Sequence, residues 1–476
     1  MERINAWNTY DLGIQKSCMD FGEDYKDFLN HGKTERECID RFVNEAEECG
    51  YIELSRAIRE GRKLSAGDKV YSVWMNKSMV LFEIGSEPFM NGINILGAHI
   101  DSPRLDVKQN PMYEDSDIAY LDTHYYGGIK KYQYVTLPLA IHGVIVKKNG
   151  ETVILRVGEE DDEPVFFVSD LLIHLSKDQL AKTAAGVIEG EALDVIIGSK
   201  PVVIDGDTMP GKKEIKDGKD AVKKALLKVL SNLYGIEEAD FESAELEIVP
   251  AGKARDAGFD RSMVLGYGHD DRCCAYPCFR AQTEVHDLGR TSCTLLVDKE
   301  EIGSVGATGM RSKFFENALA EVMNLCGQYS ELALRRTLAN SCMLSSDVGA
   351  AFDPSYASVF DKKNVAYLGR GMVFNKFTGS RGKSGSNDAN AEYIAHLRGI
   401  FEENNVCTQT AELGKVDQGG GGTIAFILAL YGMNVIDCGI PVLSMHSPWE
   451  AISKADLYET YRGYKAFLKN ASLTNQ

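Results

Sequence analysis

The sequence predicts an α/β fold with a mainly parallel central sheet flanked by helices, and a β-rich second domain inserted into it. Short apolar runs closed by polar and Gly residues, such as Leu295–Val297, are typical of buried strands. Over most of the chain such runs alternate with helical patterns, as in a parallel sheet covered on both faces. Between about residues 107 and 247 this alternation gives way to hairpin signals. We therefore expect a discontinuous first domain, residues 1–106 and 248–476, and an inserted domain, residues 107–247.

Composition places the chain among globular proteins and excludes some functions. It has 476 residues, 44% hydrophobic and 26% charged, with a net charge of −18. An acidic surface disfavours nucleic acid, because phosphate contacts need basic side chains. The N-terminal stretch MERINAWNTYDLG has no apolar segment typical of a signal peptide, and no run reaches the roughly 18 apolar residues of a membrane helix. The 11 cysteines follow no disulfide pattern, so we expect reduced thiols and a cytoplasmic location.

The first elements have clear local signals. Thr34 and Glu37 form a capping box, and the helix that follows has apolar residues at helical spacing and ends at Gly50. KVYSVWMNKSMVLFEIG predicts two strands that turn at Asn76-Lys77. A third strand, Ile93–Leu96, leads directly into GAHIDSPRLD.

The inserted segment and the remainder follow in order. Asn149-Gly150 between two β-branched runs predicts a hairpin, a polar loop spans residues 205–220, and a helix spans Ala221–Tyr234. SAELEIVP, residues 243–250, is interpreted as a strand returning to the first domain. The remaining segments alternate between strand and helix: TSCTLLVDKEE, a helix around Phe314–Leu325, CMLSSDVG, a helix around Ala389–Phe401, a helix after GGGGT, IPVLSMHS and a final helix.

Polar residues recur where the apolar strands end. The set comprises His99, Asp101, Asp270, Glu300, Glu301, Asp347 and His446. Individually, each has an ordinary structural interpretation: a turn, a helix N-cap or a core histidine. Together they would supply two imidazoles and several carboxylates at one edge of one sheet, where open α/β sheets bind ligands. His99 and Asp101, two residues apart in an extended segment, share one side, so the carboxylate would orient the imidazole.

This inventory suits two divalent cations. A pair of cations needs a bridging carboxylate, with a His and a carboxylate completing each side, and a further Glu to take a proton from water. In an extended stretch Glu300 and Glu301 would point to opposite sides, so one would hold a metal and the other would act on the water. The GxSxG and HExxH motifs of other hydrolases are absent from the sequence.

The ordered motifs GAHIDSPRL, DD after a Gly-rich approach, DKEEIGS, SSDVGAAFDP and MHS resemble the M18 family of metalloaminopeptidases, often called aspartyl aminopeptidases, and more distantly other dinuclear zinc aminopeptidases. The resemblance spans His99 to His446 and includes a long insertion. It implies a zinc-aminopeptidase-like fold and an enzyme that removes single N-terminal residues from peptides. It also implies that His99 and Asp347 bind one metal, Glu301 and His446 the other, and Asp270 both. Asp101 would orient His99, and Glu300 would be the general base.

The resemblance also concerns assembly and substrate. It implies a homo-oligomer, a dodecamer built on dimers through the inserted domain, in which His174 reaches a neighbouring subunit's active site. Against this stands the interpretation of His174 as a surface residue of an amphipathic helix. The chain departs from the family where a Trp and an Arg are missing from residues 122–143, and where KSGSN, Lys383–Asn387, replaces a Tyr-containing stretch. The preferred N-terminal residue therefore stays open, and the metal is Zn²⁺ with Mn²⁺ or Co²⁺ as alternatives.

Three other motifs have simpler interpretations. GKS at Gly382–Ser384 lacks the earlier Gly of a phosphate-binding loop, GGGGT at Gly419–Thr423 is a tight turn before a helix, and Cys273-Cys274 are small buried residues of a helix. Two alternative functions remain: a dinuclear carboxypeptidase, deacylase or dipeptidase, and a non-catalytic scaffold with the same fold.

Overall fold

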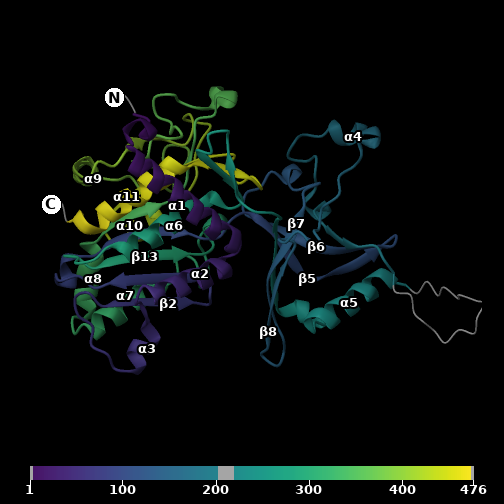
Figure 1. Cartoon of the computed structure of the whole chain (residues 1–476), viewed down its shortest axis with the longest axis horizontal. Helices are drawn as coiled ribbons and strands as arrows, with labels where there is room; N and C mark the ends of the chain where they lie inside the picture. The colour runs from purple at the N-terminus through teal and green to yellow at the C-terminus, as the bar shows by residue number, and fades with distance from the viewer. Residues whose placement is uncertain (1–3, 202–218, 473–476) are drawn as a thin grey trace, which may run out of the picture. The chain divides into compact units, whose positions relative to one another are not determined.

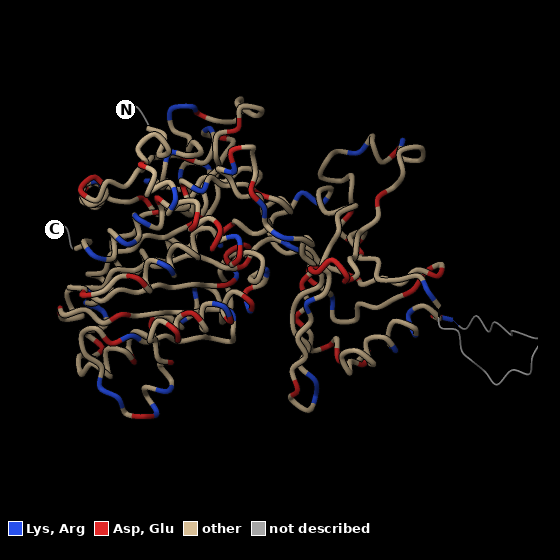
Figure 2. Tube along the Cα trace, in the orientation of Figure 1, with Lys and Arg blue, Asp and Glu red and all other residues tan. Residues whose placement is uncertain are grey.

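The computed structural model describes residues 4–201 and 219–472, and the chain divides into two compact units (Figure 1). The first unit ends at Ser102 and resumes at Ala254, and the second unit spans Pro103–Lys253. Most of the polar loop predicted at residues 205–220 lies outside the described residues. Along both units Asp and Glu are interspersed with Lys and Arg (Figure 2). Among the described residues, no helix combines the length and apolar composition that a membrane span needs.

A nine-stranded mixed sheet forms the centre of the first unit. Its strands, in spatial order, are β1 (Ile52–Glu53), β2 (Lys69–Trp74), β3 (Ser78–Glu83), β13 (Ser292–Val297), β4 (Asn94–His99), β14 (Cys342–Ser346), β18 (Asn434–Gly439), β16 (Met372–Asn375) and β17 (Thr408–Thr410). The four strands β13, β4, β14 and β18 are mutually parallel, whereas β3 and β16 run antiparallel to their inner neighbours. The predicted α/β class is confirmed, and the sheet is mixed.

Successive side chains along the strands point to opposite faces of the sheet, so the core has two layers. On β4, Leu96 and Ala98 face one apolar cluster, and Ile95 faces the other. The first cluster is covered by α1 (Leu12–His31), α2 (Glu35–Glu48), α6 (His269–Glu284), α9 (Ala391–Glu403) and α11 (Lys454–Asn470). The second is covered by α3 (Leu54–Arg59), α7 (Phe314–Leu325), α8 (Glu331–Ala339) and α10 (Ala425–Ala429). Helices therefore cover both faces of the sheet (Figure 1).

A second sheet in the same unit has five strands, in the order β11 (Arg255–Ala257), β12 (Met263–Gly266), β20 (Glu450–Ser453), β19 (Pro441–Leu443) and β15 (Gly349–Ala350). The chain passes into it from the large sheet at two places. β18 is followed after Ile440 by β19, and β14 is followed after two residues by β15. The small sheet thus begins where strands of the large sheet end.

The second unit has a six-stranded antiparallel sheet in the order β8 (Thr152–Val157), β7 (Leu139–Val146), β10 (Ala244–Pro250), β5 (Arg104–Asp115), β6 (Ile118–Tyr126) and β9 (Val195–Gly198). The predicted hairpin at Asn149-Gly150 is confirmed, with Gly150 at φ +85° between β7 and β8. The predicted helix Ala221–Tyr234 is α5. The interpretation of residues 243–250 as a strand returning to the first domain is wrong. β10 pairs with β7 and β5, because Leu246 and Ile248 belong to the apolar core of this unit.

The capping box at Thr34 offers a test of local stability. The Thr34 hydroxyl accepts a hydrogen bond from the Glu37 amide at 3.3 Å, and the Glu37 carboxylate accepts one from the Thr34 amide at 3.1 Å. We expect Thr34→Ala to destabilise the first unit by about 1 kcal/mol, because the partly buried Glu37 N–H loses the hydroxyl that caps the helix. Thermal unfolding measures the change. Thr34→Ser keeps the hydroxyl and should recover most of the loss; equal losses would contradict a role for the cap.

Candidate metal centre

Two residues of the site lie at the carboxyl ends of adjacent parallel strands. His99 is the last residue of β4, and Asp347 directly follows β14. These strands are paired in parallel register, with Leu344 opposite Leu96 and Ser345 opposite Gly97. Their ends therefore meet at one edge of the sheet, as the sequence predicts.

Glu300 and Glu301 do not lie in an extended stretch, so this part of the prediction is wrong. The strand β13 ends at Val297, and Lys299 adopts a left-handed conformation at φ +69°. The chain then enters the 3₁₀ turn η7 (Glu300–Ile302). The two side chains therefore differ in position because of a tight turn, and strand alternation plays no part.

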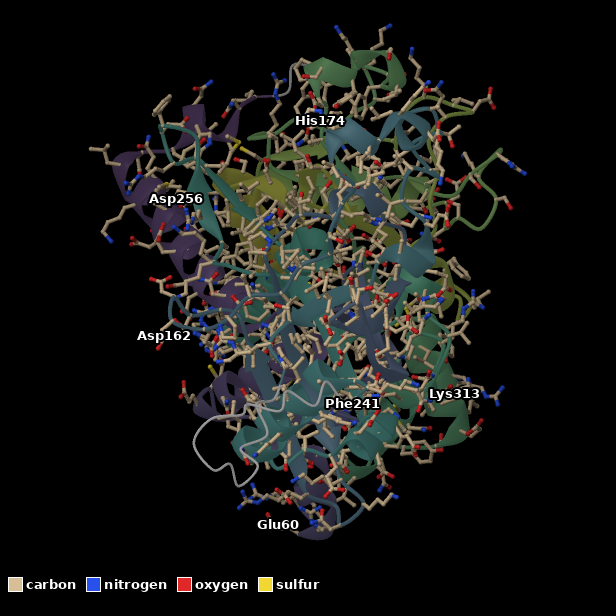
Figure 3. The ribbon with its side chains drawn as sticks, turned by 90° about the vertical axis from the view of Figure 1, so that its right-hand side faces the viewer. Glu60, Asp162, His174, Phe241, Asp256 and Lys313 are labelled. Atoms are coloured by element: carbon tan, nitrogen blue, oxygen red, sulfur yellow. The ribbon has the colours of Figure 1, made fainter. Side chains whose placement is uncertain are left out.

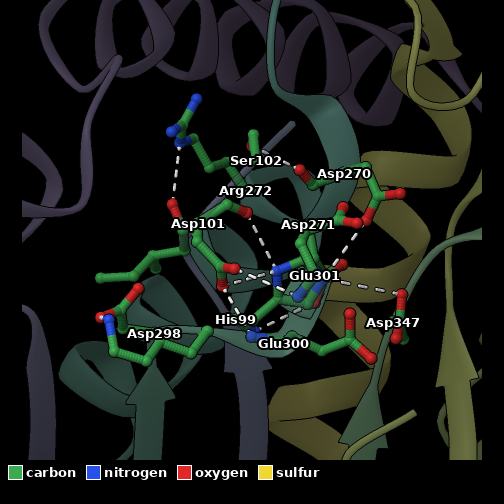
Figure 4. A network of polar contacts seen from close by, with 12 residues as sticks. His99, Asp101, Ser102, Asp270, Asp271, Arg272, Asp298, Glu300, Glu301 and Asp347 are labelled. Carbon is green, nitrogen blue, oxygen red and sulfur yellow. Dashed lines mark hydrogen bonds and ion pairs between the residues drawn. The ribbon is translucent and has the colours of Figure 1, made fainter. Parts of the chain in front are cut away.

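Asp101 fixes both this turn and the ring of His99 (Figure 4). Its two carboxylate oxygens accept hydrogen bonds from the backbone amides of Glu300 and Glu301, each at 3.1 Å. The Nδ1 atom of His99 lies 3.3 Å from the Asp101 carboxylate and 3.0 Å from its carbonyl oxygen. The Nε2 atom of His99 is thereby directed to the other carboxylates.

Asp270 and His446 come from the small sheet, so the prediction of one edge of one sheet is wrong. Asp270 lies in the first turn of α6, which follows β12, and His446 follows β19. His446 follows the passage of the chain from β18 in the large sheet to β19 in the small one, and β12, which precedes Asp270, belongs to the same small sheet. The ligands thus converge at the junction of two sheets.

Asp270 lies between the two imidazoles. Its Oδ1 is 3.3 Å from His99 Nε2, and its Oδ2 is 3.2 Å from His446 Nε2. Glu301 Oε1 lies 3.5 Å from His446 Nε2, and Asp347 Oδ1 lies 3.8 Å from His99 Nε2. Each imidazole therefore has its own carboxylate partner, and Asp270 is shared.

Burial and charge crowding set the protonation of these groups. Burial alone would raise the pKa of Asp270, but His446 and His99 hold it well below its usual range. Burial raises the pKa of Glu300 to about 8, and the neighbouring Asp347 adds to the rise. Burial and the charge of Asp270 likewise raise the pKa of Glu301. Carboxylates this close repel one another, and a cation would relieve the repulsion.

The residues fit a metal by three criteria. Three of their buried atoms, His99 Nε2, Asp270 Oδ1 and Glu301 Oε1, have no hydrogen-bond partner among the described residues. Ligand atoms of His99, Asp270 and Glu301 lie within 4.8 Å of one another, and so do those of His99, Glu300 and Asp347. Imidazole with carboxylate is a donor set that zinc accepts. A bound ion would satisfy buried atoms that lack a hydrogen bond in such a cluster.

The cluster lines a cavity of about 800 Å³, to which Glu300, Glu301, Asp270, Asp347 and His446 all contribute. Residues of the KSGSN and GGGGT stretches form part of its wall: Lys383, Gly419, Gly420, Gly421, Gly422 and Thr423. The other predicted site residue, His174, lies in the second unit, in the 3₁₀ turn η4 (Ile173–Leu175), where its side chain is exposed (Figure 3). His174 therefore lies in a 3₁₀ turn and not in the amphipathic helix that was the alternative interpretation. Its contact with substrate stays a prediction.

Sequence reasoning missed two buried carboxylates beside the cluster. Asp437 on β18 lines the cavity and accepts a hydrogen bond from the Thr423 hydroxyl. Glu450, the first residue of β20, accepts hydrogen bonds from the backbone amides of Asp270 and His446. Its position four residues after His446 was the available signal. Cys273 and Cys274, by contrast, are buried in α6 as expected, and burial raises the pKa of both thiols.

Comparison with known proteins gives a consistent family. The model of the aminopeptidase I zinc metalloprotease family (M18) matches residues 28–468. A probable M18 family aminopeptidase 1 from Clostridium acetobutylicum is 60% identical over 471 residues, 98% of each chain. The crystal structure of an M18 aminopeptidase from Thermotoga maritima, 40% identical, superposes with a TM-score of 0.91 over 99% of this chain and all of the other. The mApe1 dodecamer from S. cerevisiae shares the fold, with a TM-score of 0.73 at 19% identity over 94% of this chain and 96% of the other.

Zinc should stabilise the chain, because crowded buried carboxylates gain a counter-charge only when a cation is bound. At a free zinc concentration about 100 times its Kd, one site contributes about 2.7 kcal/mol to the free energy of unfolding. We expect chelation to lower the melting temperature and added Zn²⁺ to restore it. Glu301→Gln, which removes one charged oxygen, should reduce the shift; an undiminished shift would contradict the assignment of Glu301 as a ligand.

Proposed function

This chain belongs to the M18 family of zinc metalloproteases, and from that premise we propose that it removes N-terminal residues from peptides at a pair of divalent cations. The observation that carries the proposal is the position of Asp270, whose two oxygens face two different histidines. A carboxylate that presents one oxygen to each of two imidazoles is suited to bridge two ions. His99 with Asp347 would hold one ion, and His446 with Glu301 the other.

When bound, the two cations would act as Lewis acids that lower the pKa of a bound water towards about 7. The residues of the chain have separate tasks. Asp101 keeps the turn of Glu300 and Glu301 in place through two backbone hydrogen bonds. Glu300 lines the same cavity as the ligands, which suits it to accept the proton of the attacking water and return it to the leaving amine. Its raised pKa would fall when cations occupy the neighbouring ligands, so that the carboxylate is ionised at neutral pH.

Assembly and substrate complete the proposal. The fold is shared with the S. cerevisiae mApe1 dodecamer, which supports a homo-oligomer, with a dodecamer built on dimers as the expected form. The second unit would supply the contacts, and His174 of one subunit would reach a neighbour's active site. Zn²⁺ is the expected metal, because the family is one of zinc metalloproteases, and Mn²⁺ or Co²⁺ would accept the same oxygen and nitrogen donors. We also propose a cytoplasmic location.

The two adjacent glutamates should respond differently to the same substitution. Glu300→Gln removes the proton acceptor but keeps the shape, so we expect two metals per chain and a kcat lower by about 10²–10⁴-fold. Glu301→Gln should lower metal occupancy. Metal analysis with steady-state kinetics on both variants separates the two roles. A fully active Glu300→Gln enzyme with two bound metals would show that another group is the base.

Substrate form separates an aminopeptidase from related hydrolases. We expect free N-terminal amino acids to be released from unblocked peptides and none from the same peptides with an acetylated N-terminus. A carboxypeptidase or deacylase would retain activity on the blocked peptides, and a scaffold protein would be inert with both. A panel of aminoacyl substrates with Asp, Glu, Lys, Leu and Met would then measure the preference for the first residue.

A further inference from the structure

Glu450 joins the two metal-ligand segments that come from the small sheet. Its side chain is 2% exposed, and both oxygens of its carboxylate accept hydrogen bonds. One oxygen accepts a hydrogen bond from the His446 amide at 2.7 Å, and the other from the Asp270 amide at 3.1 Å. We propose that Glu450 is a positioning residue, which sets the spacing between Asp270 and His446 and thereby the affinity for metal. The inference rests on the two-cation site proposed above.

The topology of the small sheet gives Glu450 this position. β20 is the strand between β12 and β19, and these two strands precede Asp270 and His446. Glu450 is paired with Gly266 at the end of β12, and Ala451 is paired with Leu443 at the end of β19. The chain therefore leaves the sheet on both sides of Glu450, and a single side chain reaches both departing segments.

Regular secondary structure does not fix either ligand. Asp270 has non-helical dihedral angles, φ −79° and ψ 108°, although it lies in the first turn of α6. His446 has φ +64°, in the left-handed region. A buried backbone amide outside a regular helix or sheet needs another hydrogen-bond acceptor. Glu450 supplies one such bond to each residue.

The arrangement repeats the one around Asp101 with different segments. Asp101 holds the amides of Glu300 and Glu301, which follow the large sheet, and Glu450 holds the amides of Asp270 and His446, which follow the small sheet. A carboxylate can accept at both oxygens, whereas a carboxamide has only one acceptor. Substitution of Glu450 by Gln must therefore leave one of the two amides facing an NH₂ group.

Asp456 provides a matched control. It is also completely buried, and its two oxygens accept hydrogen bonds from the Gly369 and Gly371 amides at 2.7 and 2.6 Å. These amides belong to a loop without proposed ligands. Asp456→Asn therefore removes the same kind of contact and should lower stability without changing the metal site.

The test is the zinc affinity of the full chain, measured by competition with a chromophoric chelator, together with melting temperatures. Residues that orient metal ligands typically change metal affinity by about 10–100-fold when replaced, so we expect losses in this range for Glu450→Gln. Glu450→Asp has a side chain one methylene shorter, so its carboxylate cannot reach both amides, and we expect a similar loss of zinc affinity. It provides a second variant if one of the two folds poorly. The zinc affinity of Asp456→Asn should stay within about twofold of that of the parent, because Asp456 orients no proposed metal ligand.

The outcomes are distinct. A parent chain that binds no zinc would overturn the two-cation proposal itself. If the parent binds two ions and a folded Glu450 variant binds them as tightly, only the positioning role fails. It fails equally if Asp456→Asn weakens zinc binding as much as Glu450→Gln, because the effect would then follow from lost stability alone.

Discussion

Repulsion among buried carboxylates is the constraint on which the rest of the site depends. Asp270, Glu300, Glu301 and Asp347 line one cavity, and only two imidazoles face them directly within the cluster. Burial raises the pKa of most of these acids, because an ionised carboxylate loses solvation and gains like-charged neighbours. A fold that keeps such groups together at neutral pH needs a rigid frame and a positive counter-charge. The sheets supply the first, and a bound cation would supply the second; the family to which the chain belongs is one of zinc metalloproteases.

Some of the proposed ligands lie at the ends of buried strands, and the others lie in turns. His99 belongs to a fully buried strand with parallel neighbours on both sides, and its neighbour Asp347 follows another. The remaining ligands lie in turns with left-handed or non-helical residues, where the ladder of the sheet no longer fixes the backbone. In these turns side-chain carboxylates accept hydrogen bonds from the backbone amides. Regular structure thus places the site, and hydrogen bonds from single side chains determine its detailed shape.

Local patterns were sufficient for many elements of the fold. The capping box at Thr34, the hairpin at Asn149-Gly150 and the helix Ala221–Tyr234 depend on residues close in sequence, and the structure has all three. The returning strand at residues 243–250 was misplaced, because its apolar pattern fits either sheet and only the partner strands decide between them. The order of motifs also gave the family, which depends on residue identity and not on packing.

For the site, the sequence by itself determined which side chains are available: His99, Asp101, Asp270, Glu300, Glu301, Asp347 and His446 all lie in one cluster in the structure. Polar residues next to apolar strands can be recognised in the sequence, because strand ends and ligand types are local features. Only the tertiary structure decided that two sheets contribute, that Glu300 and Glu301 share a 3₁₀ turn, and that Glu450 contacts both Asp270 and His446. Those features depend on hydrogen bonds between segments as many as 200 residues apart, and no local pattern encodes such distances.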